Sequence, residues 1–124
     1  FWRKLYLYVK GDTNVSAVAT PIPGDFQKLT SFGTVENVAA TILPKGVEGK
    51  MNGIDTKPNR YIFDYTVTPP NKNPRRLLTV FTLRPGRCIV TVTAQCEEAA
   101  FAQEEQELRG IIDSFVLRPE RGYE

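Results

Sequence analysis

Alternation of hydrophobic and polar positions predicts that most of this chain is β-structure. Apolar side chains recur at every second position in five short stretches, which predicts five strands: residues 5–9, 15–20, 61–68, 77–83 and 88–95. In the first strand the alternation places Leu5, Leu7 and Val9 on one face. A proline-rich loop and an Arg-Pro-Gly-Arg turn separate the last three strands. Because short links join neighbouring antiparallel strands, residues 61–95 are predicted to form a meander.

Apolar residues spaced three and four positions apart predict helices between and after these strands. Residues 25–29 are expected to form one helical turn, and a better helix begins at Thr34, whose hydroxyl can cap it, and ends before Pro44. A second helix, starting at residue 97 or 99 and ending at 114, has one apolar face: Phe101, Leu108, Ile111, Ile112 and Phe115. Residues 45–59 show little periodicity and are interpreted as a long connection with at most one short strand.

These elements predict one α+β domain over residues 1–124, an antiparallel sheet covered by helices, with residues 118–124 as a C-terminal tail. The 124 residues carry a net charge of +2, which is too small to argue for nucleic-acid binding by itself. Aromatic side chains on the strands could stack on bases, but packing against the sheet is the commoner role of strand aromatics. No apolar run reaches the length of about 18 residues that a membrane-spanning helix needs.

The absence of histidine argues against an enzyme. Without it, the chain lacks the usual general base near neutral pH, the Ser-His-Asp arrangement and the commonest metal ligand. Acid–base chemistry would have to come from Asp, Glu, Lys or Tyr alone. We therefore expect a protein that binds or assists a partner.

Charge is unevenly distributed along the meander. Between Asp64 and Glu97 there is no acidic residue, but five basic ones fall there: Lys72, Arg75, Arg76, Arg84 and Arg87. A solvated basic hairpin explains this pattern most simply. The functional alternative is a surface that contacts an acidic partner, and these five residues are the partner-binding candidates.

Two further groups of residues could carry chemistry. Asp12, Asp25 and Asp55 lie in predicted turns or loops and could bind a hard cation, although such aspartates more often bond to their own backbone. Cys88 and Cys96 lie eight residues apart, about 26 Å along a regular strand, which is too far for a disulfide. Two small buried apolar residues are the favoured interpretation; a strand break that lets them meet, or a bridge to a partner chain, stays open.

Three segments, in order, resemble the PsbP-domain family. Thr-Asn-Val-Ser-Ala-Val-Ala-Thr-Pro at residues 13–21 resembles that family's "N-V-S-V-…-T-P" strand, and Phe-Gly-Thr-Val-Glu-Asn-Val at 32–38 resembles its "Y-G-S-P-E-E-F" helix start. Residues 87–117 are similar to its closing strand and helix, with Ala94-Gln95 and a final Ser114-Phe115-Val116. The resemblance covers residues 5–117.

The resemblance implies a central antiparallel sheet sandwiched between helices, in a non-catalytic protein of the chloroplast thylakoid lumen, peripheral to the membrane. It implies an extrinsic role in the assembly, stability or regulation of a photosynthetic complex, most of all photosystem II, whose founding family member helps to retain calcium. The lack of histidine, and Phe101 where the family often has Trp, favour an auxiliary PsbP-like protein. The alternative is a calcium- or small-ligand-binding module of the lumen, and a homodimer stays open.

Overall fold

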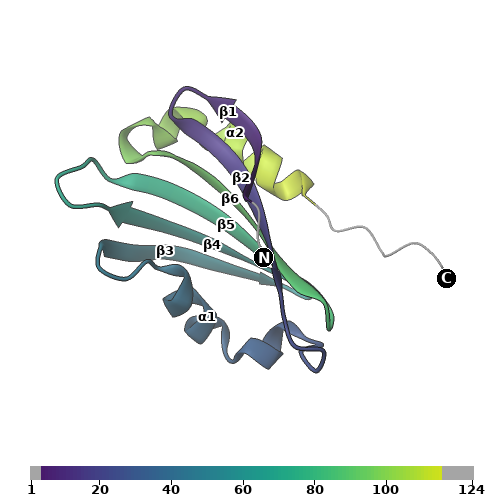
Figure 1. Cartoon of the computed structure of the whole chain (residues 1–124). Helices are drawn as coiled ribbons and strands as arrows, with labels where there is room; N and C mark the ends of the chain where they lie inside the picture. The colour runs from purple at the N-terminus through teal and green to yellow at the C-terminus, as the bar shows by residue number, and fades with distance from the viewer. Residues whose placement is uncertain (1–3, 116–124) are drawn as a thin grey trace.

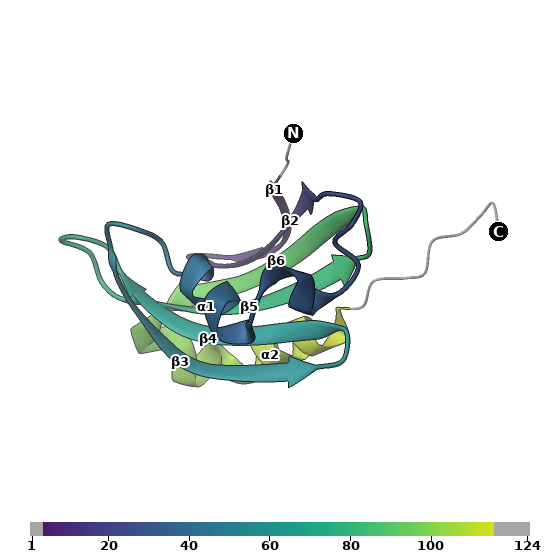
Figure 2. The same ribbon diagram turned by 90° about the horizontal axis from the view of Figure 1, so that it is seen from below.

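The computed structural model describes residues 4–115, which form a six-stranded antiparallel sheet with helices on both faces. The strand order is β1-β2-β6-β5-β4-β3. The strands are β1 (Lys4–Lys10), β2 (Thr13–Pro21), β3 (Glu48–Lys57), β4 (Arg60–Thr68), β5 (Arg75–Arg84) and β6 (Cys88–Glu97). The helices are η1 (Leu29–Phe32), α1 (Val35–Ile42), η2 (Glu98–Ala100) and α2 (Phe101–Ser114). Figures 1 and 2 show α1 and α2 on opposite faces of the sheet. The predicted α+β sandwich and its meander are confirmed.

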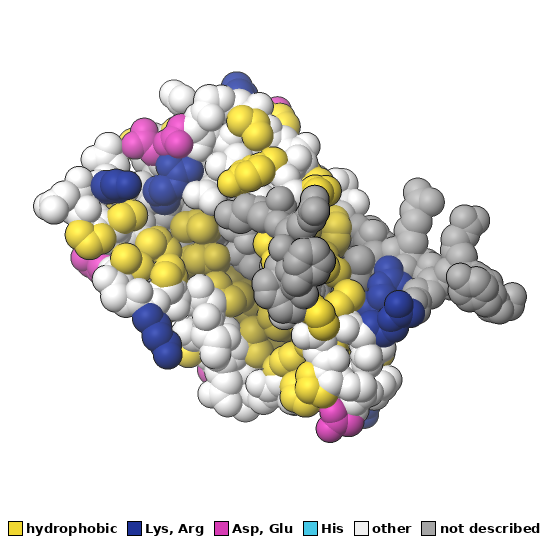
Figure 3. Space-filling model, in the orientation of Figure 1, with side chains coloured by type: hydrophobic (Ala, Val, Ile, Leu, Met, Phe, Trp, Pro, Cys, Tyr) yellow, Lys and Arg dark blue, Asp and Glu magenta, His cyan; other side chains and the backbone are white. Residues whose placement is uncertain are grey.

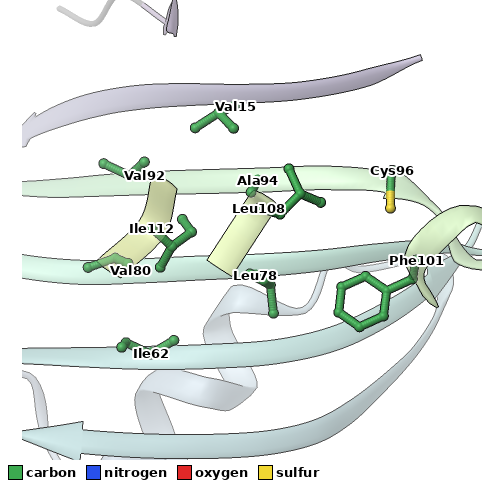
Figure 4. Packing of buried hydrophobic residues seen from close by; sticks show 10 residues of the cluster. All are labelled: Val15, Ile62, Leu78, Val80, Val92, Ala94, Cys96, Phe101, Leu108 and Ile112. Atoms are coloured by element: carbon green, nitrogen blue, oxygen red, sulfur yellow. The ribbon is translucent and has the colours of Figure 1, made fainter. Parts of the chain in front are cut away.

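Each face of the sheet has its own hydrophobic core, because successive residues of a strand point to opposite faces. In β4, Ile62 packs on the α2 side while its neighbour Phe63 packs on the α1 side. Figure 4 shows the α2-side core, where side chains of α2 meet those of the strands: Val15, Ile62, Leu78, Val80, Val92, Ala94, Cys96, Phe101, Leu108 and Ile112. The apolar face predicted for the last helix is the face that it buries.

The cap predicted for α1 is present. The Thr34 hydroxyl accepts a hydrogen bond from the backbone N–H of Asn37 at 3.1 Å, which satisfies one of the free donors of the first turn. Gly33 precedes it with φ +100°, a conformation that side-chain-bearing residues rarely adopt. Val38 and Ala39 are buried in the α1-side core.

Residues 45–59 are where the prediction fails most clearly, because they contain the ten-residue strand β3. This strand lies at the edge of the sheet and pairs only with β4. Nearly all its side chains are exposed on both faces, so no apolar alternation marks it. Backbone hydrogen bonds to β4 hold it in place instead, with a register shift between Met51 and Gly53.

Two smaller predictions are also wrong. Residues 25–29 do not form a helical turn: the Gly86 N–H donates to the Phe26 carbonyl at 2.8 Å, which ties this segment to the β5–β6 turn, and a 3₁₀ helix begins only at Leu29. In β1, a register shift between Tyr6 and Tyr8 breaks the alternation, so that Leu5, Leu7 and Val9 do not share one face. The predicted tail at 118–124 lies outside the described residues.

Candidate functional site

The five basic candidates lie at two opposite ends of the sheet. Lys72, Arg75 and Arg76 belong to the end formed by the β1–β2 turn, the β4–β5 loop and the β6–η2 junction, which we call the loop end. Arg84 and Arg87 flank the β5–β6 turn at the other end. The length of β5, about 30 Å at 3.3 Å per residue, separates the two groups. The structure therefore brings three of the five together and leaves two apart.

Arg75 lies on the α1 face and holds the β1–β2 turn. Its Nη1 donates to the Asp12 carboxylate at 2.7 Å and its Nη2 to the Asp12 carbonyl at 2.9 Å. Its Nε donates to the Gln95 side chain on β6 at 2.8 Å. One side chain thus links three segments of the loop end. These contacts are all within the chain, although the Asp12 side chain itself is 70% exposed.

Arg76, the next residue, points to the α2 face and joins a second set of charges. Its Nε and Nη2 donate to the two carboxylate oxygens of Asp64 at 2.5 and 3.0 Å, and its Nη1 donates to Glu98 at 2.9 Å. The guanidinium carbon lies 4.0 Å from the centre of the Phe101 ring, within cation–π distance. Two hydrogen bonds from one guanidinium to both oxygens of one carboxylate form one of the stronger hydrogen-bond arrangements in proteins.

Asp64 is the centre of this second set. Besides Arg76 it accepts a hydrogen bond from Arg109 Nη2 at 3.1 Å, and Arg109 also donates to Glu105 at 2.6 Å. Partial burial disfavours the charge of Asp64, but the hydrogen bonds and positive charge of Arg76, with help from Asn52 and Arg109, lower its pKa below the usual 3.8. The carboxylate is therefore firmly ionised near neutral pH. Sequence reasoning missed this cluster.

The β4–β5 loop, residues 69–74, projects from the sheet between these two sets of contacts (Figure 1, at left). The Lys72 N–H donates to the Pro69 carbonyl at 3.2 Å, and Asn73 donates to Glu97 at 3.1 Å. The Lys72 side chain is exposed and lines a shallow depression of about 460 Å³ together with Asp12, Arg75 and Glu97. On the other side of the loop lies a second depression of about 450 Å³ with mixed charge: Glu48, Lys50, Arg76 and Glu98. Figure 3 shows charged side chains around the rim of this view and hydrophobic ones across its centre.

The three candidate metal ligands do not share a site. Asp12 lies at the loop end, where it is bonded to Arg75, and Asp25 and Asp55 lie towards the opposite end. Asp55 is 3.5 Å from Lys57. Within residues 4–115, no three His, Cys, Asp or Glu side chains come together as metal ligands would. The three aspartates therefore do not form one shared metal site, and calcium binding stays a prediction from the resemblance.

Both cysteines are free. β6 is paired without interruption from Cys88 to Glu97, so the strand break that could have let the two thiols meet is not there. Cys96 is fully buried in the α2-side core, and burial, with the nearby charge of Glu104, raises the pKa of its thiol. Cys88 is half-buried.

In the described part of the chain, no helix is long and apolar enough to cross a membrane.

This geometry defines a small α+β sandwich whose loop end carries two sets of ion pairs, one on each face of the sheet. The family model for PsbP matches residues 6–117, and the chain belongs to the PsbP family. No curated protein matches the chain.

Two solved structures have a similar fold. The solution structure of cyanobacterial PsbP (CyanoP) from Synechocystis sp. PCC 6803 superimposes with a TM-score of 0.68 at 20% identity, covering 94% of this chain and 82% of that one. The crystal structure of the "Protein of Unknown Function PA94 from Pseudomonas aeruginosa, Putative Regulator" superimposes with a TM-score of 0.58 at 16% identity, covering 97% and 83%. At these identities the likeness concerns the fold, and a shared fold does not by itself define a function.

Proposed function

We propose that this chain is a non-catalytic extrinsic protein of the thylakoid lumen that assists the assembly, stability or regulation of photosystem II. The observation that carries the proposal is the PsbP family match over residues 6–117, which spans almost the whole described chain. The fold supports it through its likeness to cyanobacterial PsbP. The main acidic cluster of the described residues adds a supporting argument, because its central carboxylate, Asp64, is held by Arg76 and Arg109.

The contact surface that the structure favours is the β4–β5 loop with Lys72 at its tip. Arg75 and Arg76 follow the loop directly and are bonded to Asp12 on one face and to Asp64 on the other. They position the loop, whereas Lys72 is exposed and can meet an acidic partner. Loops held by a rigid scaffold commonly carry binding residues, and a charge at the rim mainly affects the rate of encounter.

The test is binding of the purified chain to photosystem II membranes from which salt has removed the extrinsic proteins. Lys72→Glu should slow association several-fold at low salt, with the difference shrinking as the salt concentration rises. Lys28→Glu is the matched control, since Lys28 is also exposed but lies at the other end of the sheet, beside the β3–β4 turn. Equal binding of the two variants would place the contact elsewhere, and absence of binding by the unmodified chain would remove the proposed function itself. Reversing Arg75 and Arg76 is a poorer test, because it breaks internal ion pairs.

A further inference from the structure

A depression on the α1 face lies at the end of the sheet opposite the loop end. Three segments that are far apart in the sequence border it: residues 27–30 before and at the start of η1, residues 57–59 at the β3–β4 turn, and the β5–β6 turn at Pro85 (Figure 1, lower right). Tyr61 and Leu83 also line it. Its volume is about 440 Å³, within the range of about 300–1,000 Å³ that is usual for small-ligand pockets.

The floor of the depression is apolar and one of its walls is held in place. Leu29 and Tyr61 belong to the α1-side core, and Leu83 packs against the same core. The Tyr61 ring stacks on that of Phe81, with the ring centres 6.3 Å apart and an angle of 12° between the planes. A backbone hydrogen bond of 2.8 Å joins residues 25–29 to the β5–β6 turn and fixes one wall. A site formed before the ligand arrives loses less affinity to reorganisation.

The Tyr61 hydroxyl is a polar group on this apolar floor. Tyr61 is 7% exposed, and within residues 4–115 its hydroxyl has no hydrogen-bond partner. In that part of the chain Asn14 Oδ1 is the only fully buried side-chain polar atom without a partner, so the Tyr61 oxygen is in contact with solvent. Two residues further along β4, the Tyr65 hydroxyl is bonded to that of Thr79 at 2.8 Å. Since most buried polar groups are bonded in this way, the Tyr61 hydroxyl is the group left available to a ligand.

The rim of the depression is positively charged. Lys28 and Lys57 are both exposed and line it, and none of its lining residues is acidic. The Lys57 ammonium lies 3.5 Å from Asp55, but both side chains are well exposed, at 44% and 63%. An ion pair this exposed is weak, so Lys57 can still attract an anion.

We propose that this depression binds a small amphipathic carboxylate. The apolar body of the ligand covers Leu29 and Leu83, and its carboxylate accepts a hydrogen bond from the Tyr61 hydroxyl while the two lysines supply the opposite charge. Because the depression is open on one side and the ligand is small, the expected Kd is about 0.1–1 mM. The inference does not rest on the proposed role at photosystem II, since Lys72 lies at the other end of the sheet.

Titration of the ¹⁵N-labelled chain with 1-naphthoate, followed by two-dimensional NMR, tests the site. The probe has a flat apolar body and one carboxylate. Amide signals of residues 27–30, 57–61 and 83–87 should shift together and saturate with one Kd. The proposal is wrong if no signal saturates by about 10 mM probe, or if the saturating shifts fall on another part of the chain.

Tyr61→Phe tests the hydroxyl without disturbing the fold, because that hydroxyl makes no hydrogen bond within the described residues. The change should weaken binding of 1-naphthoate about fivefold and leave the stability to urea nearly unchanged. Tyr65→Phe is the matched control: it removes the same atom from the same strand, but from a hydroxyl bonded to Thr79. It should lower the stability and leave the Kd for 1-naphthoate unchanged. Equal Kd values for Tyr61→Phe and the unmodified chain would overturn the assigned role of the hydroxyl.

Lys57→Gln tests the charge at the rim. It should raise the Kd for 1-naphthoate about two- to threefold at low salt, and the difference should shrink as salt is added. Lys50→Gln removes the same charge from an exposed position on the same strand, away from the depression, and should have no effect. The neutral probe 1-naphthalenemethanol should bind several-fold more weakly than 1-naphthoate and should not respond to Lys57→Gln. If the neutral probe binds as tightly as the carboxylate, the depression is an apolar site without preference for an anion, and the proposal fails.

Discussion

The ion pair between Asp64 and Arg76 should contribute measurably to stability, and Arg76→Met is the change that tests this. The pair is mostly shielded, with 15% of the Asp64 side chain and 19% of the Arg76 side chain exposed. Removing one partner of a fully buried pair costs about 3–5 kcal/mol, and a fully exposed pair is worth about 0–1 kcal/mol. Since Arg76 also bonds to Glu98 and covers Phe101, we expect Arg76→Met to lower the free energy of unfolding by about 2 kcal/mol.

Urea unfolding near neutral pH measures this loss, and a double-mutant cycle assigns it to the pair. Arg76→Met, Asp64→Asn and the double variant are compared with the unmodified chain. The double variant should cost less than the sum of the single ones by about 1 kcal/mol or more, because either single change already breaks the shared hydrogen bonds. In a domain of this size, 2 kcal/mol corresponds to a fall in Tm of about 8 °C.

Lys10→Met is the matched control for this prediction. Lys10 is 63% exposed and its nitrogen is 3.8 Å from the nearest carboxylate oxygen, so its loss should cost less than about 0.5 kcal/mol. If Arg76→Met costs no more than Lys10→Met, or if the cycle gives no coupling, the idea that this cluster supports the loop end is wrong.

Three further predictions concern single residues. The folded state lowers the pKa of Asp64, so the carboxylate's contribution to the free energy of unfolding is complete above its usual pKa of 3.8 and is lost as the pH falls through the lower folded value. Urea unfolding measured across this acidic range should therefore show a free energy of unfolding that falls less steeply with pH for Asp64→Asn than for the unmodified chain. Cys88 should react with Ellman's reagent in the folded protein, whereas Cys96 should react only as fast as the protein unfolds; equal reactivity of the two thiols would contradict the burial of Cys96. Cys96→Ser should lower the free energy of unfolding by about 1–3 kcal/mol, and Cys88→Ser should lower it clearly less. Thr34→Ala should cost about 1 kcal/mol in thermal or urea unfolding, and Thr34→Ser should retain most of the stability, since a hydroxyl restores the cap; equal losses would show that the cap contributes little.

The sequence predicts a helix or strand where burial of its side chains produces a regular spacing of apolar residues. β4 buries side chains on both faces, α2 buries one stripe, and both elements were placed within a few residues of their observed bounds. β3 could not be found in this way. Its side chains face solvent on both sides, and the hydrogen bonds that hold it belong to the backbone, which every sequence shares. The shifted register of β1 was equally hidden, because a bulge changes the facing of residues without changing their order.

The charged cluster shows a different limit. Asp64 and Arg76 are twelve positions apart, and they meet because β4 and β5 pair antiparallel across the loop. The predicted meander placed Asp64 on one strand, but its next strand, predicted over residues 77–83, began one residue after Arg76. The sequence did not predict the register between β4 and β5 or the face on which each side chain lies. Thr66, not Asp64, pairs with Arg76, and the Asp64 carboxylate reaches the guanidinium diagonally across the two strands.

Adjacent arginines on a strand serve two faces, and this decides how the loop end should be understood. In the sequence, Arg75 and Arg76 look like one basic patch with Lys72. In the structure, Arg75 clamps the β1–β2 turn through Asp12, and Arg76 clamps β4 and η2 through Asp64 and Glu98. The loop is therefore held from both faces by the two residues that follow it. Changes at either arginine should alter stability and binding together, whereas a change at Lys72 should alter binding alone.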